Sequence, residues 1–203
     1  MKKTISLIVL LAIVQVSAAP FDGGYEVGDI ARDFQLKNVD GASISLSDYK
    51  EAKGFIVVFT CNTCPYAKLY EQRIIALDKK YKGDGYPVIA IQPNDGSLSP
   101  GDSFEAMQAN SKKKGFSFPY LLDETQEIAR AYGAARTPHV FLLNKESGKL
   151  RVAYIGAIDN NHQDSNKADK KYVEDAVDAL IAAKKVPVTL TKAIGCTIKW
   201  SGT

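Results

Sequence analysis

The segment between residues 55 and 92 constrains the fold of this chain more than any other part of the sequence. It opens with an apolar, mostly β-branched run at residues 55–60, which predicts a strand buried on both faces. One apolar stripe at helical spacing follows, formed by Ala67, Tyr70, Ile74, Leu77 and Tyr81. Residues 87–92 predict a second buried strand. Strand, helix and strand in such close succession indicate a βαβ unit, whose two strands run parallel.

Weaker patterns on both sides extend this unit into a larger sheet. We expect strands at 34–37 and 43–46, helices at 102–114 and 123–133, strands at 139–143 and 150–155, and a helix at 170–184. Asp102 is expected to cap the first of these helices, and Asp123 with Gln126 to begin the second in a capping box. A turn at residues 144–148 makes the last two strands antiparallel. The order predicts one α/β domain, with a mixed central sheet flanked by helices.

The first 18 residues have the pattern of a secretory signal peptide. Lys2 and Lys3 precede an apolar run at residues 5–16, and small residues follow at 17–19. We expect cleavage after Ala18, which leaves a mature domain at residues 19–203; an uncleaved anchor is the alternative. The run is too short to span a bilayer comfortably, and no later stretch is apolar enough. The sequence therefore predicts a periplasmic or secreted protein, in a compartment where disulfides persist.

Composition narrows the classes of function. Hydrophobic residues make up 45% and charged residues 24% of the chain, which excludes a largely disordered protein. Without Lys2 and Lys3, 24 Lys and Arg face 23 Asp and Glu, a net charge of +1. So small a charge predicts no nucleic-acid partner. With two histidines and three cysteines the sequence favours no metal site, and we expect a monomer without a cofactor.

Cys61 and Cys64 lie where the first buried strand meets its helix. The first turn of a helix exposes unpaired N–H groups and a partial positive charge, which stabilise a thiolate there. We therefore expect Cys61 to be the attacking thiol with a lowered pKa, and Cys64 to be the more buried, resolving thiol. Pro65 fits the first helical turn, where its missing N–H costs nothing. A static disulfide, inert buried thiols or a metal site are the alternatives to a redox-active pair.

Further along the chain, the Thr137–Pro138 bond opens a strand. Pro is tolerated at the first residue of a strand, and an ordinary trans proline is the alternative to a special role.

Together these features resemble the thioredoxin superfamily. The segments 27–36 and 40–46 are similar to redoxins of the alkyl hydroperoxide reductase/thiol-specific antioxidant group. The match is strongest to an exported bacterial subgroup, which shares FTCNTCPY at 59–66, DSFEAM at 102–107, PYL at 119–121 with DETQ at 123–126, and GCTIKW at 195–200. The resemblance implies a thioredoxin-like fold, with a helical insertion before the strand that follows Pro138. It also implies a redox-active Cys61/Cys64 pair that faces a cis peptide bond between Thr137 and Pro138, whose edge would bind substrate.

The chain departs from thioredoxin itself in two ways. Thr60 stands where thioredoxin has a tryptophan, and residues 55–59 contain no acid to accept a proton from the buried cysteine. A water molecule or Glu51, at the start of this strand, is a candidate for that proton acceptor.

Three functions remain in competition. An exported thiol–disulfide oxidoreductase, with disulfides or thiols of proteins or small molecules as substrates, needs only the CxxC pair and a binding edge. The second candidate is a thiol peroxidase with antioxidant activity. Peroxiredoxins resemble one another in a Pro-x-x-x-Thr-x-x-Cys motif. This chain lacks the motif, although Arg136 could bind a peroxide. A copper-handling protein of the thioredoxin fold would use a C-x-x-x-C-P motif and a distant histidine, for which His139 and His162 are the candidates; here the cysteine spacing is one residue short. The direction of electron flow leaves no mark in the sequence.

The third cysteine, Cys196, allows two interpretations. It alternates with Ile194, Ile198 and Trp200 at a period of two, so an extended tail would place all four on one face. Free cysteines are often simply buried, and we favour that structural role. The alternative is a third redox thiol that resolves an oxidised Cys61.

Overall fold

The computed structural model describes residues 23–202, so the predicted signal peptide lies outside the described residues. Seven strands form the central sheet: β1 (Gln35–Asn38), β2 (Ser43–Ser45), β3 (Gly54–Phe59), β4 (Val88–Gln92), β5 (Tyr120–Leu122), β7 (His139–Glu146) and β8 (Lys149–Gly156). Their order across the sheet is β2-β1-β5-β4-β3-β7-β8. β6 (Arg136–Thr137) and β9 (Cys196–Thr197) form a separate two-stranded ladder. The helices are α1 (Pro65–Tyr81), α2 (Phe104–Lys114), α3 (Glu127–Tyr132) and α4 (Tyr172–Ile181).

The predicted βαβ unit forms the centre of this fold. β3 pairs in parallel with β4, with Val57 opposite Ile89, and every residue of β3 is buried. α1 connects the two strands and turns its predicted apolar stripe inward. β5 joins on the far side of β4, also in parallel, whereas β7 pairs antiparallel with β3. The sheet is therefore mixed, as predicted.

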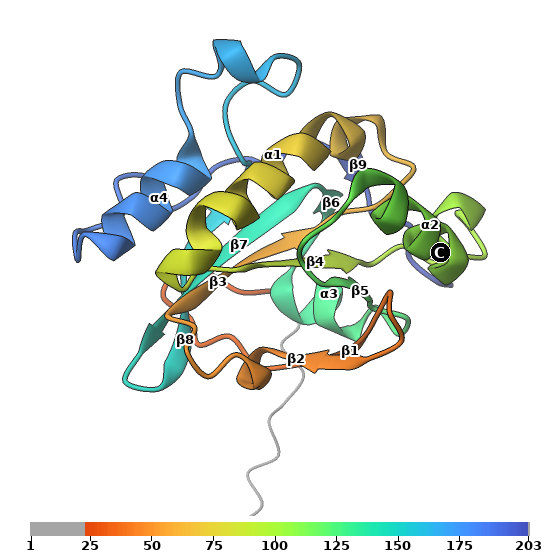
Figure 1. Cartoon of the computed structure of the whole chain (residues 1–203), viewed down its shortest axis with the longest axis horizontal. Helices are drawn as coiled ribbons and strands as arrows, with labels where there is room; N and C mark the ends of the chain where they lie inside the picture. Colours follow the sequence, from red (N-terminus) through yellow and green to blue (C-terminus); the bar gives the residue numbers. More distant parts are fainter. Residues whose placement is uncertain (1–22, 203) are drawn as a thin grey trace, which may run out of the picture.

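Helices cover both faces of the sheet (Figure 1). α1 and α4 lie on one face, where their apolar side chains pack in one core cluster with Met107 of α2. α3 and the segment before β3 cover the other face, where Tyr132 packs edge-on against Phe59 and Phe141. Within residues 23–202 the structure has no helix that is both long and apolar enough to cross a membrane.

The hairpin of β7 and β8 is longer than the sequence predicts. Its strands run to Glu146 and from Lys149, so only two residues remain for the turn. Ser147 and Gly148 both have positive φ angles, 49° and 79°. Two such residues match the twist of an antiparallel hairpin, which explains the antiparallel pairing that was predicted.

Both predicted helix starts are wrong. Ser103, not Asp102, is the N-cap of α2, where its side chain accepts a hydrogen bond from the Ala106 N–H. α3 begins four residues later than predicted, because Gln126 takes a left-handed conformation with φ 60°. Asp123 still serves the helix: its carboxylate accepts from the N–H of Ala129 at 2.7 Å. Asp102 and Gln126 are thereby free for other contacts, described below.

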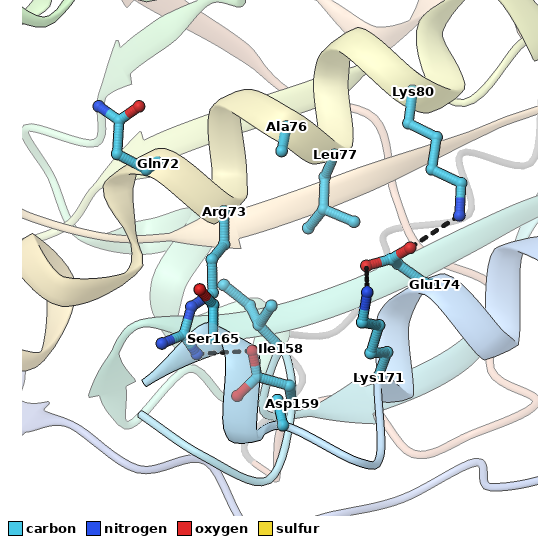
Figure 2. A pocket seen from close by; sticks show the side chains of 11 residues that line it. Gln72, Arg73, Ala76, Leu77, Lys80, Ile158, Asp159, Ser165, Lys171 and Glu174 are labelled. Carbon is cyan, nitrogen blue, oxygen red and sulfur yellow. Dashed lines mark hydrogen bonds and ion pairs between the residues drawn. The ribbon is translucent and has the colours of Figure 1, made fainter. Parts of the chain in front are cut away.

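A groove between α1 and α4 is lined by eleven residues, of which five are charged and pair with one another (Figure 2). Arg73 of α1 donates to Asp159 at 2.6 Å, and both side chains are largely buried. The same guanidinium donates to the carbonyl oxygens of Asn161 at 2.6 Å and His162 at 3.2 Å. No sulfur atom lines this groove, and its paired charges hold the loop after β8 against α1.

Replacing Arg73 with lysine is expected to lower the free energy of unfolding by about 1–2 kcal/mol. A lysine keeps the charge beside Asp159 but has no planar fork to reach both loop carbonyls. Urea unfolding followed by circular dichroism measures the change. Arg32→Lys is the matched control, because its partner Glu127 is exposed and the change there should stay within about 0.5 kcal/mol. Equal losses in the two variants would contradict this role of Arg73.

Candidate active site

Cys61 follows the end of β3, and Cys64 is the N-cap residue of α1. Pro65 occupies the first helical position, as predicted. The two cysteines are free and buried, with 4% and 3% of their surface exposed. Cys64 was expected to be the more buried of the two, but the exposed fractions of the two side chains are nearly equal. The two side chains pack together in one small cluster with Ala67.

The bond between Thr137 and Pro138 is cis, which confirms the prediction. Thr137 lies directly against both cysteines. Its hydroxyl is 3.2 Å from the Cys61 Sγ atom, and its carbonyl oxygen accepts from the Cys64 thiol at 3.1 Å. The fold thus brings together all four residues that the sequence singled out.

The C-terminal tail occupies the backbone edge next to this proline. β9 pairs antiparallel with β6, with Cys196 opposite Thr137, and the N–H of Cys196 donates to the Cys64 Sγ atom at 3.3 Å. Gly195 passes so close that an added Cβ atom would lie 2.1 Å from the Thr137 carbonyl oxygen. The predicted binding edge is therefore already filled by the protein's own chain.

Several contacts hold this tail in place. The amide of Gln126 donates to the Lys199 carbonyl and accepts from the Ser201 N–H, each at 2.8 Å. The Arg130 guanidinium lies over the Trp200 ring at 4.4 Å. Arg136, considered above as a peroxide ligand, instead donates to the Gly195 carbonyl at 3.0 Å.

Asp102 is a site residue that the sequence analysis misassigned. It is fully buried, and its carboxylate accepts from the backbone N–H groups of Asn62 and Thr63, the two residues between the cysteines, at 2.7 and 3.0 Å. It also accepts from the Thr63 hydroxyl at 2.7 Å, and Ser99 and Asn94 complete the shell. The loop between the cysteines is thus shaped around one carboxylate. Only the run of Ser, Pro, Gly and Asp at 99–102 hinted at a tight turn.

A second buried acid lies behind Cys61. Glu71 of α1, with 5% of its surface exposed, pairs with Lys114 at 2.5 Å. Together with Cys61 and Tyr120 it lines a cavity of about 10 Å³, roughly the space of one water molecule. Glu51, the earlier candidate for a proton acceptor, is exposed at the opposite end of β3. Glu71, unlike Glu51, shares a cavity with Cys61.

The hydrogen bonds around the two sulfur atoms favour ionisation of Cys64 over Cys61, the reverse of the expected direction, and the identity of the attacking thiol stays a prediction. The Cys61 thiol donates to Cys64, and the Cys196 thiol and the N–H groups of Ala67 and Cys196 do the same; these bonds lower the pKa of Cys64 to about 4 against the cost of burial. The same bond to Cys64, followed by burial and the charge of Asp102, raises the pKa of Cys61. Burial, and then the neighbouring Cys64, raises the pKa of Cys196 to about 11.

Neither histidine joins the sulfur atoms. The Nδ1 atom of His139 accepts from the Ala135 N–H at 3.4 Å, and its ring packs on Phe141. Burial, followed by the charge of Arg136, lowers the pKa of His139 to about 4. His162 lies in the loop after β8, against the Tyr66 ring. Among residues 23–202, no group of three or more His, Cys, Asp or Glu side chains is arranged to hold a metal ion.

Comparison with known proteins places this site in a family. The chain is similar to the thiol-disulfide oxidoreductases ResA of Geobacillus thermodenitrificans, with 25% identity over 164 residues, and of Halalkalibacterium halodurans, with 28% identity over 131 residues. These alignments cover 78% and 64% of this chain, and 87% and 69% of the respective relatives.

Solved structures agree with the fold. A conserved uncharacterized protein of Geobacillus kaustophilus superposes with a TM-score of 0.81 at 34% identity, covering 88% of this chain and 94% of that one. An exposed lipoprotein thioredoxin of Streptococcus pneumoniae gives 0.55 at 22% identity, covering 75% and 99%, and bears on the fold alone. The predicted thioredoxin-like fold is thereby confirmed. The AhpC/TSA family profile matches residues 27–155, so the chain belongs to the AhpC/TSA family.

Proposed function

We propose that this protein is an exported thiol–disulfide oxidoreductase that uses Cys61 and Cys64 as its exchanging pair. One observation carries the proposal: Cys61 and Cys64 pack together at the N-terminus of α1, and both sulfur atoms lie against Thr137 of the cis Thr137–Pro138 bond. The relatives named thiol-disulfide oxidoreductase bear out the enzyme class.

The chemistry is a balanced exchange of two electrons. When protonated, the Cys64 thiol donates to the Thr137 carbonyl oxygen; loss of that proton gives the thiolate that reacts, while Cys61 remains a thiol. Transfer of two electrons to a substrate disulfide yields two substrate thiols and a Cys61–Cys64 disulfide, and the reverse reaction oxidises a substrate dithiol. Cys64 is the sulfur through which exchange passes, since the thiolate is the reacting form. In this proposal the proton of Cys61 leaves through the water-sized cavity that this thiol shares with Glu71.

A redox titration tests this function. The mature protein is equilibrated in glutathione or dithiothreitol buffers, and disulfides are located by peptide mass spectrometry. We expect one Cys61–Cys64 disulfide in oxidising buffers and free thiols in reducing ones. A reduction potential of about −270 mV for the Cys61/Cys64 pair would indicate a reductant, and one of about −120 mV an oxidant. A pair that stays reduced in every buffer, or never opens, would contradict the proposal.

Membership of the AhpC/TSA family favours peroxide reduction as the second candidate. A Cys64 thiolate could attack a peroxide oxygen, give a sulfenic acid and release water or an alcohol; Cys61 would then form the disulfide and release water. Peroxide consumption in the presence of dithiothreitol, compared with insulin reduction, distinguishes the two activities.

A redox-active cysteine pair favours export, because such a pair works where disulfides persist. The proposal includes cleavage after Ala18 and a periplasmic or secreted mature protein. Mass spectrometry of the mature protein from the cell envelope and medium tests it. A chain that retains Lys2 and Lys3 in the cytoplasm would contradict it.

Replacing Cys61 with alanine should raise the pKa of Cys64 from its value of about 4. The variant removes the thiol that donates to the Cys64 sulfur, which is the largest stabilising contact of the thiolate. The pH dependence of the ultraviolet thiolate absorbance and of iodoacetamide alkylation measures the shift. Cys61→Ser is the matched control: its hydroxyl can still donate, so the shift should be smaller. Equal titration midpoints in the wild type and both variants would show that Cys61 does not stabilise this thiolate.

A further inference from the structure

Three sulfur atoms, rather than two, meet at the active site. The side chain of Cys196 packs against the cluster of Cys61 and Cys64, and its backbone N–H donates to the Cys64 Sγ atom at 3.3 Å. Cys64 therefore lies between two cysteines, Cys61 on the loop and Cys196 on the tail. A disulfide from Cys64 to Cys196 requires only a closer approach of side chains that are already neighbours.

These cysteines differ in access to solvent. Cys61 and Cys64 are 4% and 3% exposed, whereas Cys196 is partly exposed. The β6–β9 ladder covers the buried pair from the side on which the resemblance to thioredoxins places a substrate. A protein substrate that approaches from this side therefore contacts Cys196 before it can contact Cys64.

Direct access to the pair would require the tail to detach. That step breaks the bonds of Gln126 to the tail, the bond of Arg136 to Gly195 and the β6–β9 ladder. Each such bond stabilises the closed arrangement, and detachment would expose the tail's apolar contacts as well. A route through Cys196 leaves all of these contacts in place.

We propose that Cys196 is a third redox residue, which forms a disulfide with Cys64 and carries exchange between the buried Cys61–Cys64 pair and thiols or disulfides at the surface. The inference rests on the proposed function and deepens it, because it names the sulfur that external partners reach. The tail strand thereby has a chemical role in addition to its packing.

The steps balance. In the oxidised protein the Cys196 thiolate attacks the Cys64 Sγ atom; the Cys64–Cys196 bond forms, the Cys61–Cys64 bond breaks, and the proton lost by Cys196 passes to Cys61. This internal exchange involves no net oxidation. An external thiolate then attacks the Cys196 Sγ atom and forms a mixed disulfide, and Cys64 leaves as a thiolate. A second external thiol attacks the external sulfur, which releases Cys196 and one external disulfide. Two external thiols have then supplied two electrons, and the reverse sequence reduces a substrate disulfide.

The environment of Cys64 suits this role. A thiol of low pKa leaves faster in thiol–disulfide exchange. Donors from the loop, the helix and the tail all converge on the Cys64 sulfur. An external thiolate that attacks Cys196 therefore expels the best stabilised of the three sulfur atoms.

The first experiment removes Cys61 and asks which disulfide remains. The mature Cys61→Ser protein is oxidised with diamide at low protein concentration and mapped without reduction. We expect an intramolecular Cys64–Cys196 disulfide. If Cys64 and Cys196 stay free or link only between chains, while the wild type forms Cys61–Cys64 normally, the inference is overturned and the proposed function stands.

The second experiment follows recycling of the oxidised protein by stopped flow, with reduced thioredoxin as the probe dithiol. We expect Cys196→Ser to slow recycling by about tenfold or more, while it still forms the Cys61–Cys64 disulfide on oxidation. Thr197→Ala is the matched control in the same strand and should recycle at the wild-type rate. Recycling of Cys196→Ser at the wild-type rate would overturn the inference; absence of exchange in the wild type itself would overturn the proposed function.

Discussion

Replacing Cys64 with serine is expected to reduce thiol–disulfide exchange to the uncatalysed background. Cys64 is the common partner in both disulfides discussed above, so its loss removes the Cys61–Cys64 pair and the link to Cys196 together. Serine keeps the size and some of the hydrogen bonds, but its hydroxyl is not ionised and does not replace a thiolate nucleophile. Insulin reduction with dithiothreitol, followed by turbidity, measures the loss.

The single-cysteine variants provide the comparison. Cys196→Ser is expected to retain the Cys61–Cys64 disulfide but to recycle slowly, whereas Cys64→Ser should form no intramolecular disulfide with either neighbour. A Cys64→Ser protein that still reduces insulin would place the reaction on Cys61 and Cys196 alone. That result would refute the assignment of the thiolate to Cys64.

Replacing Asp102 with alanine is expected to lower the free energy of unfolding by about 4 kcal/mol. The carboxylate is fully buried and accepts from the backbone of Asn62 and Thr63 as well as from three side chains. Alanine leaves these donors buried without an acceptor, which costs more than the net contribution of the bonds themselves. Urea unfolding of the reduced protein measures the change.

Two further variants keep this prediction testable. Asp102→Asn retains one acceptor oxygen and should lose about half as much, so it serves if the alanine variant does not fold. Asp84→Asn, on an exposed turn, is the control and should stay within about 0.5 kcal/mol of the wild type. A loss of similar size at Asp84 and Asp102 would show that the loop does not depend on this carboxylate.

The elements predicted most accurately are those with the most regular patterns. β3, α1 and β4 match expectation to within a residue or two, because a fully apolar run and a helical stripe each have a clear period. β5, with three residues, and β6 and β9, with two each, are too short to show a period at all. These short strands form because their backbone groups pair with strands that are distant in the sequence. A single sequence does not show which distant segments will pair.

The candidate site could likewise be predicted only where its residues belong to a regular local pattern or to the family resemblance. The positions of Cys61 and Cys64 follow from the local βαβ pattern, and the cis Thr137–Pro138 bond from resemblance. Asp102 looked like an ordinary helix cap, since its partners Asn62 and Thr63 lie about 40 residues earlier in the chain. The bonds that favour ionisation of Cys64 come first from Cys61 and then from the tail, and the tail donor at Cys196, 132 residues beyond Cys64, has no local signature.

The docking of the tail gives this protein a built-in optical probe. Trp200 is the single tryptophan of the chain, and its ring lies under the Arg130 guanidinium, four residues from Cys196. Indole emission depends on nearby charge and on contact with water, so any displacement of β9 changes its intensity and wavelength. Fluorescence of the unlabelled protein can therefore follow strand movement in real time, through each cycle of oxidation and reduction.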